Sequence, residues 1–264
     1  MNAPLVTIVL PVFNTDRYLR ECLTSIVDQS FQDWELIAVD DGSSDDSLAI
    51  LNSFSDKRFR VYENQRNFGP AYTRNFIIAN SLGDFIALQD SDDYMGPDRL
   101  TSQVNALLEN PALDLVGSRM TLIADDGSVM GIGGSIREQF SVLDLLFGSD
   151  APAHATLMGR KSWFVRNPYP EYLYRAEDRY MIVNAVNNSD FAYGALKKPL
   201  YFYRYIGSLD PRKKLAAYRV ERTNLIGFLD RNHQKLFYFL FSMLKTLITS
   251  VNVLVSRLVN VLRH

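Results

Sequence analysis

The chain has 264 residues, of which 47% are hydrophobic and 22% are charged, so it is long enough for one large globular domain with or without an appendage. Its net charge of −2 gives no global reason to expect nucleic-acid binding. Cys22 is the single cysteine, which excludes an internal disulfide and a cysteine-based zinc site and suits a reducing cytoplasm.

The first hundred residues alternate between strand-like and helix-like segments. Leu5–Pro11 and Trp34–Val39 are apolar, β-branched runs, and the apolar residues between them recur at helical spacing. The pattern continues through predicted helices at Ser47–Phe54 and Ala71–Ser81 and predicted strands at Arg58–Glu63 and Phe85–Gln89. This alternation predicts a doubly wound α/β sheet, mostly of parallel strands, with ligands bound beyond the carboxyl ends of the strands. The start of the chain lacks a basic segment and a cleavage site, so we expect a protein that is not secreted.

The regular alternation of predicted strands and helices becomes weaker after Leu100. We expect a helix at Leu100–Leu108, strands within Leu113–Ile123 and a hairpin turn at Asp125–Ser128. Residues 131–172 are rich in Gly and Pro and show weak periodicity, whereas Glu177–Asn187 has a helical pattern and Pro199–Tyr205 is strand-like. We therefore divide the chain into one large domain, 1–212, with halves at 1–100 and 101–212, and a helical tail, 213–264.

The end of the tail, 236–263, has its own pattern. Polar residues recur every three or four positions, at Ser242, Lys245, Thr249, Asn252, Ser256, Asn260 and Arg263. Nearly everything between them is apolar, which predicts a long amphipathic helix with a narrow polar stripe, too interrupted for a membrane span. Three interpretations remain open: packing on the protein's own core, a position in a membrane interface, or a contact between subunits. The sparse polar stripe and nearby basic residues favour membrane or partner contact.

An acidic cluster ends the strand predicted at Phe85–Gln89. Residues two apart in an extended chain point the same way, so Asp90 and Asp92 can converge on one cation. A hard divalent cation held by one or two carboxylates keeps positions open for substrate phosphates. The alternative is a solvated acidic turn in which Asp92 or Asp93 caps the helix expected to start near Pro97.

Polar motifs follow the other predicted strands as well. They are Pro11–Asn14, Asp40–Asp45, Asn64–Gly69 leading into Arg74-Asn75, and Gln89–Asp93. Each alone can be a turn, a loop or a helix cap. Their joint occurrence at the edge where a nucleotide binds predicts one composite site.

With these motifs the sequence resembles glycosyltransferase family 2, whose members have the GT-A fold. The matching pieces are Leu10-Pro-Val-Phe-Asn14, Val39-Asp-Asp-Gly-Ser43, Asn67-Phe-Gly69 with Arg74-Asn75, Leu88–Asp93 followed by Pro97–Leu100, and the later pair Glu177-Asp178. The resemblance covers roughly residues 4–210. It implies that 1–212 is a catalytic domain with a nucleotide-binding half, 1–100, and an acceptor half, 101–212. As an ordered set the motifs are specific, although each is weak by itself.

The resemblance implies roles on the donor side. Asp41 would bond the base of a nucleoside diphosphate, most often uracil, in a pocket that Pro11, Val12 and Phe13 also line. Arg74 would lie near the nucleotide. Asp90 and Asp92 match the family's Asp-x-Asp motif, in which Asp92 would hold Mn²⁺ or Mg²⁺ against the diphosphate with Asp90 in support.

On the acceptor side, the resemblance makes Asp178 the catalytic base, with Glu177 beside it and His154 at a recurrent acceptor position. An alcohol is a poor nucleophile until a carboxylate removes its proton. Direct displacement with inversion follows if that base approaches opposite the metal. The alternative for Glu177-Asp178 is a charged helix face, because Arg175 and Arg179 flank the pair.

One departure from the family pattern concerns a histidine that many relatives carry after a Tyr-Arg pair. Here Tyr203-Arg204 is followed by residues 205–208, which contain no histidine, so Arg204 or the basic cluster 212–214 would have to supply positive charge to the diphosphate. The Gln-x-x-Arg-Trp segment of processive synthases is also missing from the sequence. A single-addition transferase is therefore favoured.

The sequence thus predicts an inverting, metal-dependent hexosyltransferase that uses a UDP-sugar, with a GDP-sugar as the alternative donor. We expect a glycan or lipid-linked acceptor in surface polysaccharide synthesis, met in the cytoplasm or peripherally at the inner face of the cell membrane. Rival interpretations are a sugar-phosphate nucleotidyltransferase and a non-catalytic nucleotide-sugar-binding protein. The first is disfavoured because no glycine-rich loop follows the first strand, and a dinucleotide oxidoreductase is disfavoured for the same reason.

Overall fold

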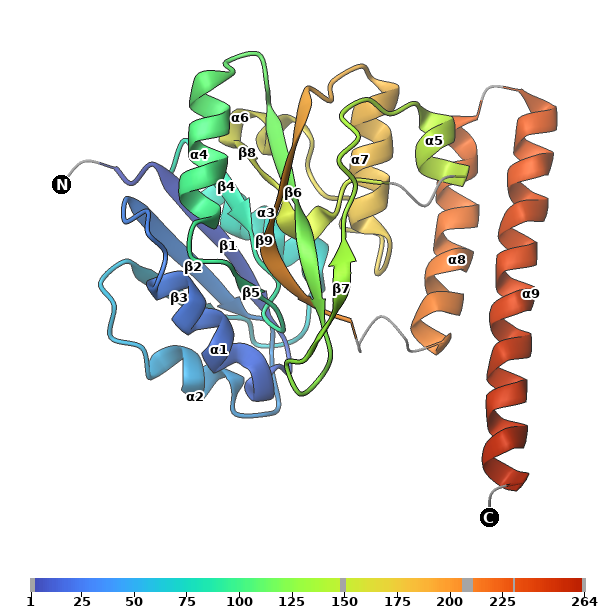
Figure 1. Ribbon diagram of the computed structural model, residues 1–264, viewed down its shortest axis with the longest axis horizontal. Helices are drawn as coiled ribbons and strands as arrows, with labels where there is room; N and C mark the ends of the chain where they lie inside the picture. Colours follow the sequence, from blue (N-terminus) through green and yellow to red (C-terminus); the bar gives the residue numbers. More distant parts are fainter. Residues whose placement is uncertain (1–2, 148–150, 206–210, 230, 263–264) are drawn as a thin grey trace.

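The computed structural model describes residues 3–147, 151–205, 211–229 and 231–262, with the backbone alone for 211–214 and 251–262. One sheet has helices on both faces, and a helical C-terminal region lies along one side (Figure 1). This confirms the predicted α/β class.

The first half of the sheet consists of parallel strands. They are β1 (Val6–Val12), β2 (Trp34–Asp40), β3 (Phe59–Glu63) and β4 (Phe85–Leu88), in the order β3-β2-β1-β4. The helices α1 (Asp16–Val27), α2 (Ser47–Asn52) and α3 (Pro70–Asn80) connect them. Because β2 and β4 lie on opposite sides of β1, the strand order reverses there, which is where such sheets bind ligands.

The second half of the sheet is mixed. It contains β5 (Tyr94–Met95), β6 (Leu115–Ile123), β8 (Met158–Arg160) and β9 (Tyr193–Arg204), in the order β4-β8-β6-β9-β5. β6 and β9 are parallel, whereas β8 and β5 run antiparallel to their neighbours. β7 (Val129–Gly133) pairs with β6 around the predicted turn at Asp125–Ser128, so the hairpin is confirmed.

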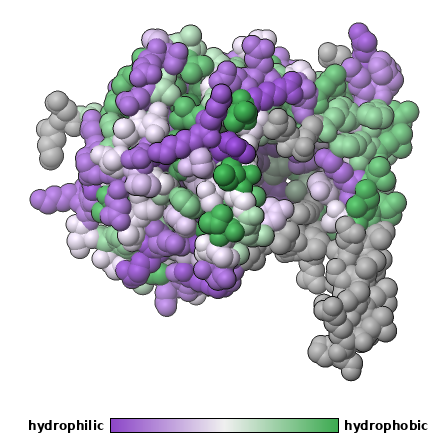
Figure 2. Space-filling model, in the orientation of Figure 1, coloured by the Kyte–Doolittle hydropathy of each residue, from purple (hydrophilic) through white to green (hydrophobic). Residues whose placement is uncertain are grey.

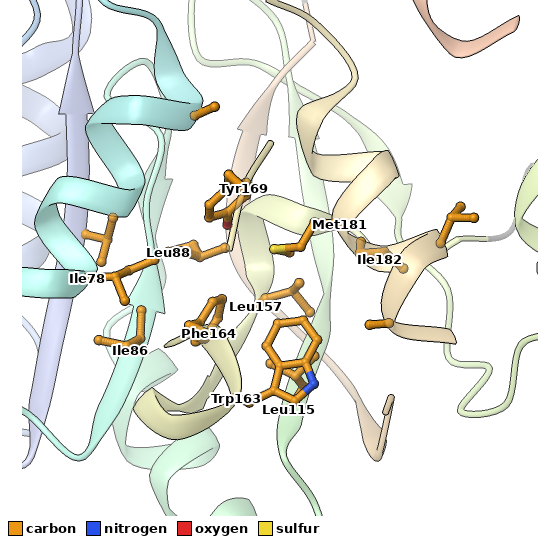
Figure 3. Close-up of a cluster of buried hydrophobic side chains, with 14 of the residues drawn as sticks. Ile78, Ile86, Leu88, Leu115, Leu157, Trp163, Phe164, Tyr169, Met181 and Ile182 are labelled. Carbon is orange, nitrogen blue, oxygen red and sulfur yellow. The ribbon is translucent and has the colours of Figure 1, made fainter. Parts of the chain in front are cut away.

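Two hydrophobic layers cover the two faces of the sheet. Successive side chains of β1 point to opposite faces, so Ile8 and Leu10 pack on α1 and on α4 (Arg99–Glu109), while Val9 faces the other side. That other layer contains α3 together with α5 (Val142–Phe147), α6 (Lys161–Arg166) and α7 (Glu177–Asn187). Trp163 and Phe164 of α6 lie near its centre (Figure 3).

The C-terminal region consists of two long helices. α8 (Pro211–Leu225) packs against α7, and after the 3-10 turn η3 (Ile226–Phe228) the helix α9 (Asn232–Leu262) runs back along α8 (Figure 1). The predicted helix at 236–263 is therefore present and begins earlier. None of the helices, over the described part of the chain, is long and apolar enough to cross a membrane.

Candidate active site

A cleft of about 490 Å³ lies at the carboxyl ends of β1 and β4. The residues placed by the sequence at the nucleotide or the metal all line it: Pro11, Val12, Phe13, Asp41, Arg74, Asp90 and Asp92. Two other hollows, of about 660 and 630 Å³, lie around Arg160 and Arg20, away from this set. The chemistry of the lining, rather than the volume, makes the 490 Å³ cleft the candidate site.

Asp41 holds one wall of the cleft. Its carboxylate accepts hydrogen bonds from the Asn64 side chain at 2.7 Å and from the backbone N–H groups of Phe68 and Gly69 at 3.0 and 2.8 Å. The turn that carries it depends on Gly42, whose φ of +76° favours glycine. A carboxylate offers about four acceptor positions, so Asp41 retains capacity for one more donor from a ligand.

The three aspartates of the acidic cluster have different surroundings. Asp90 lies 3.0 Å from an Arg74 guanidinium nitrogen, and Asp92 lines the cleft. Asp93 is buried and accepts the backbone N–H of Arg204 at 2.7 Å. Burial first, and then Asp92 and Asp90, raise the pKa of the Asp93 carboxyl well above its usual range.

The predicted helix cap at Asp92 or Asp93 is wrong. Helix α4 begins at Arg99 with Asp98 at its N-cap position, so neither residue is close enough in the chain to cap it. Asp93 instead joins the loop after β4 to β9, a contact between residues more than a hundred positions apart.

The cleft fits a divalent cation held by few protein ligands. Among the residues that the structure describes, no three His, Cys, Asp or Glu side chains converge as a ready-made metal site. Asp90 and Asp92 line the same wall, and carboxylate oxygens are the ligands that Mg²⁺ and Mn²⁺ prefer. Such a pair leaves coordination positions for phosphate oxygens.

Arg74 links the acidic cluster to the acceptor half. Its guanidinium lies 3.0 Å from Asp90 and 2.9 Å from Glu177, the first residue of α7, and its side chain is almost fully buried. Burial disfavours the charged form, but Asp90 and the other anionic partners outweigh it, so the pKa of Arg74 is raised. A permanent cation therefore stands between the two predicted halves of the site.

The N-terminus of α7 presents Glu177 and Asp178. Glu177 is buried and bonded to Arg74, so the pair is not a solvated charged helix face. The preceding residue, Ala176, has a left-handed φ of +59°, which turns the chain sharply into the helix. Asp178 is half-buried and accepts the backbone N–H of Arg179 at 2.7 Å. Asp178 contributes an upward effect on the pKa of both Arg74 and His154, so it lies close to both.

His154 belongs to the same cluster, behind the cleft. It lies in the 3-10 turn η1 (His154–Thr156), and its Nε2 is 2.7 Å from the Tyr169 hydroxyl. Burial, followed by the Arg74 charge, lowers the pKa of His154 to about 4, so the ring is neutral at neutral pH. The structure thus gathers His154 and Glu177 around Arg74, although neither they nor Asp178 line the cleft itself.

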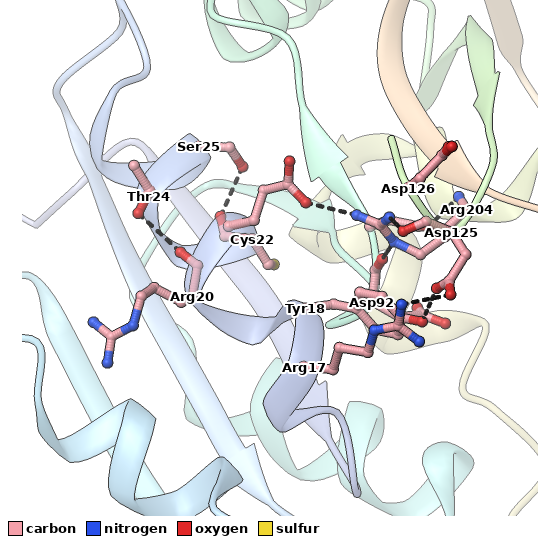
Figure 4. A network of polar contacts seen from close by, with 12 residues as sticks. Arg17, Tyr18, Arg20, Cys22, Thr24, Ser25, Asp92, Asp125, Asp126 and Arg204 are labelled. Carbon is pink, nitrogen blue, oxygen red and sulfur yellow. Dashed lines mark hydrogen bonds and ion pairs between the residues drawn. The ribbon is translucent and has the colours of Figure 1, made fainter. Parts of the chain in front are cut away.

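Arg204 acts as a brace at the other side of the acidic cluster (Figure 4). Its buried guanidinium donates to the backbone carbonyl of Asp92 at 2.9 Å and to the Glu21 carboxylate at 2.6 Å, and it lies 4.3 Å from the Tyr18 ring. It also reaches the carbonyl of Asp125 at 3.3 Å. The guanidinium N–H groups of Arg204, which the sequence analysis had suggested for the diphosphate, are thus already bonded within the protein. The basic cluster 212–214 lies where only the backbone is described.

Tyr174 and Arg175 also line the cleft and were missed as ligand-facing residues. They lie in the loop before α7, and Tyr174 is exposed. Their segment showed no periodic pattern, and a flanking charge was the only signal from Arg175. Their position follows from the left-handed turn at Ala176, which the sequence does not reveal.

Comparison with known proteins identifies a family. The profile of Glycosyl transferase family 2 matches residues 7–162, more than half of the chain. An uncharacterized glycosyltransferase of Haemophilus influenzae is 34% identical over 157 residues, which cover 55% of this chain and 63% of that protein. The poly(ribitol-phosphate) beta-glucosyltransferase of Bacillus spizizenii is 38% identical over 134 residues, which cover 49% of this chain and 20% of that protein. The matches thus span less than two thirds of these relatives' own lengths.

Solved structures share the fold. The Staphylococcus aureus TarS fragment 1–349 in complex with UDP superposes with a TM-score of 0.65 at 22% identity, covering 89% of this chain and 69% of that one. The mannosyltransferase PcManGT of Pyrobaculum calidifontis, in complex with GDP-Man and Mn²⁺, gives a TM-score of 0.61 at 17% identity, covering 86% and 64%. The architecture is therefore that of GT-A proteins.

Proposed function

The chain belongs to glycosyltransferase family 2, and we propose that it transfers a sugar from a UDP-sugar to a hydroxyl group of a glycan or lipid-linked acceptor, with inversion. The observation that carries this proposal is the shared lining of one cleft by Asp41, Arg74, Asp90 and Asp92. They come from three separate segments: the turn after β2, helix α3 and the loop after β4. Their convergence supports a nucleotide diphosphate with a bound cation.

On the donor side, Asp41 would accept an N–H of the base, and the backbone of Pro11 and Val12 would line the base pocket. Asp92 would hold Mn²⁺ or Mg²⁺, with Asp90 in support because Asp90 already shares its charge with Arg74. When bound, the cation would neutralise the charge that gathers on the leaving diphosphate. The permanently charged Arg74 guanidinium would add to that stabilisation from the buried side.

On the acceptor side, Asp178 would remove the proton from the attacking hydroxyl. It is half-buried at the start of α7, and Arg74 lies beside its neighbour Glu177. A carboxylate placed there would be the proton acceptor that general-base catalysis needs. His154, neutral at working pH, would offer hydrogen-bonding capacity to the acceptor side rather than charge.

The acceptor would belong to a surface polysaccharide and be met at the cytoplasmic face of a membrane. The polysaccharide-related name of the Bacillus spizizenii relative supports the acceptor class. The GDP-Man complex of a structural neighbour keeps GDP-sugars in the donor screen.

Calorimetric titration with UDP, with and without Mn²⁺, tests the donor half of the proposal. We expect metal-dependent binding that Asp92→Ala weakens at least about tenfold, since one charged ligand contributes more than about 1.4 kcal/mol. Asp178→Asn should keep UDP binding while abolishing transfer in a donor screen that measures nucleotide release. Asp33→Asn, an exposed change just before β2, is the matched control and should keep both UDP binding and transfer. Metal-independent UDP binding, or full turnover by Asp178→Asn, would refute these assignments.

A further inference from the structure

Helix α9 shows its apolar side to the solvent. Eight large apolar side chains between positions 236 and 248 are 42–63% exposed: Leu236, Phe237, Phe239, Leu240, Met243, Leu244, Leu247 and Ile248. At 100° per residue they cover one continuous half of the helix. Figure 2 shows this apolar patch on the upper part of α9.

Ser242 and Lys245, in the part of the polar stripe whose side chains the structure describes, face the protein instead. Ser242 is 4% exposed, and its hydroxyl lies 3.5 Å from the Tyr218 carbonyl of α8. Lys245 is partly buried, with its Nζ 4.4 Å from the centre of the Phe241 ring, and burial lowers its pKa. Tyr238 is the buried apolar anchor and packs edge-on against Phe147 of α5.

This orientation is the reverse of a surface helix, which turns its apolar side inward. The interpretation that α9 buries its apolar side on the protein's own core is therefore wrong for these eight side chains, although Tyr238 does pack on that core. Fully burying a large apolar side chain is worth about 1.5–3 kcal/mol in water, so this exposed face favours an apolar cover.

Charge indicates what that cover is. Segment 211–264 holds ten of the 28 Lys and Arg residues but only two of the 30 Asp and Glu residues of the whole chain. The tail is thus strongly basic on a protein whose remainder is acidic. We propose that α9 lies in the interface of an anionic membrane, with its eight exposed apolar side chains among the acyl chains and the basic residues at its start, Arg231 and Lys235, facing lipid headgroups.

A second copy of the chain suits this face less well. A symmetric pair of tails would bring two strongly basic segments together, and like charges at an interface oppose association. An anionic lipid surface supplies both the apolar cover and the counter-charge.

The position of α9 fits a lipid-linked acceptor, a point that rests on the proposed function. α8 separates α9 from α7, the helix that begins with Glu177 and Asp178. Arg179 of α7 lies 3.5 Å from Glu221 of α8. Glu221 in turn is close enough to Lys245 of α9 for its charge to favour the protonated amine. A membrane bound at α9 therefore lies on the acceptor side of the catalytic domain.

The test is flotation of the full chain with vesicles of phosphatidylcholine alone and of phosphatidylcholine mixed with phosphatidylglycerol. We expect binding to the mixed vesicles, weakened by high salt. The triple variant Leu240→Gln, Leu244→Gln, Leu247→Gln should bind at least about tenfold less, because it replaces three exposed leucines with a residue of similar helix propensity. Leu108→Gln, an equally exposed leucine on α4, is the matched control and should bind normally.

Failure of the wild-type chain to float with mixed vesicles, or equal flotation of the triple variant, would overturn the proposal. Sedimentation velocity separates the other occupant: a wild-type dimer that the triple variant dissociates, without vesicle binding, would assign the face to a second copy. UDP binding is measured on the same samples. Retained UDP binding with lost flotation would sink the membrane proposal alone, whereas flotation without UDP binding would sink the proposed function alone.

Discussion

Arg204 ties the aspartate-bearing loop to helix α1 and to the β6–β7 hairpin. Its guanidinium binds the Asp92 carbonyl and the Glu21 carboxylate, and its backbone N–H binds Asp93. Asp125 of the hairpin is also bound to Tyr18 and lies 2.5 Å from Arg17. A residue of β9 thus determines where the backbone of the candidate metal ligand lies.

Replacing the Arg204 guanidinium should loosen the loop after β4, which carries Asp90 and Asp92, without removing either candidate metal ligand. Arg204→Gln leaves the backbone bond to Asp93 in place but removes a buried charge from Glu21 and three carbonyls, at a cost of about 2–4 kcal/mol in the free energy of unfolding. We expect the Mn²⁺-dependent part of UDP affinity to fall about tenfold, and metal-free UDP binding to change little. Calorimetry and denaturant unfolding measure these two effects.

Arg17→Gln is the control for that variant. Arg17 pairs with Asp125 in the same network but its side chain is mostly exposed, so its loss should cost no more than about 1 kcal/mol. If both arginine variants lose metal-dependent binding equally, the hairpin as a whole, rather than the bond to Asp92, orients the ligand.

His154 makes stability depend on pH. Its pKa falls from 6.5 to about 4 on folding, so below pH 6.5 the unfolded chain takes up a proton that the folded chain does not. Stability should therefore fall as the pH drops towards 4, by about 2 kcal/mol between about pH 7 and about pH 5 for this group. His154→Gln should remove that part of the pH dependence in thermal unfolding.

His233→Gln, at an exposed position of α9, is the comparison for His154→Gln. It shares every other titrating group with the wild type, so it should retain the full loss of stability at acid pH. An identical pH profile for wild type and His154→Gln would show that His154 becomes protonated in the folded protein at its ordinary pKa.

At the residue scale, the sequence anticipated the cleft lining better than the contacts behind it. Asp41, Asp90 and Asp92 were found because they follow strands whose ends meet at one edge, and Arg74 because it lies in the helix that the motif after β3 leads into. The roles of Asp93 and Arg204 depend on β9 lying beside the loop after β4. No local sequence pattern specifies that contact.

At the scale of elements, the turn after β2 carries the wall of the cleft. A Cβ on Gly42 would lie 2.8 Å from the backbone of Arg66, in the loop whose N–H groups bind Asp41. Gly42→Ala combines a left-handed φ with this clash, so we expect a loss of about 2–3 kcal/mol in the free energy of unfolding and weaker UDP binding. Denaturant unfolding and calorimetry check both.

Gly69→Ala separates the two causes. Gly69 also has a positive φ, of +92°, but no atom lies within 4 Å of its would-be Cβ. It should therefore show backbone strain alone, about 1–3 kcal/mol for its φ of +92° and ψ of 161°, and a smaller effect on UDP binding than Gly42→Ala. Equal effects of the two variants would mean that the approach of Arg66 is unimportant.

Elements with long apolar runs were predictable, and short ones were not. β1 to β4 and the helices α2 and α3 match their predicted bounds to within two residues at each end. β5 and β8 are two and three residues long and were missed, because pairing with a neighbouring strand rather than their own periodicity holds them in place. The short helices α5 and α6 fall in 131–172, where packing on a common core replaces the local signal.

At the scale of the whole molecule, the tail is attached through few buried side chains. The boundary proposed from the sequence, between 212 and 213, falls in the first turn of α8, so both long helices belong to the tail. Tyr238 is the α9 side chain that joins the large hydrophobic cluster, where it meets Phe147. The sheet and the tail should therefore open with different free energies.

Tyr238→Ala tests this separation. Removing a buried aromatic side chain costs about 3–5 kcal/mol when the site cannot collapse, and here the loss falls on the contact between α9 and α5. Amide hydrogen exchange should accelerate along α8 and α9 while β1 to β4 keep their protection. Phe239→Ala, a neighbouring aromatic on the outward face, should leave exchange in solution unchanged but weaken binding to anionic vesicles. Equal deprotection of β1 to β4 by Tyr238→Ala would show that tail and sheet unfold as one unit, in which case membrane binding at α9 would stabilise the candidate active site as well.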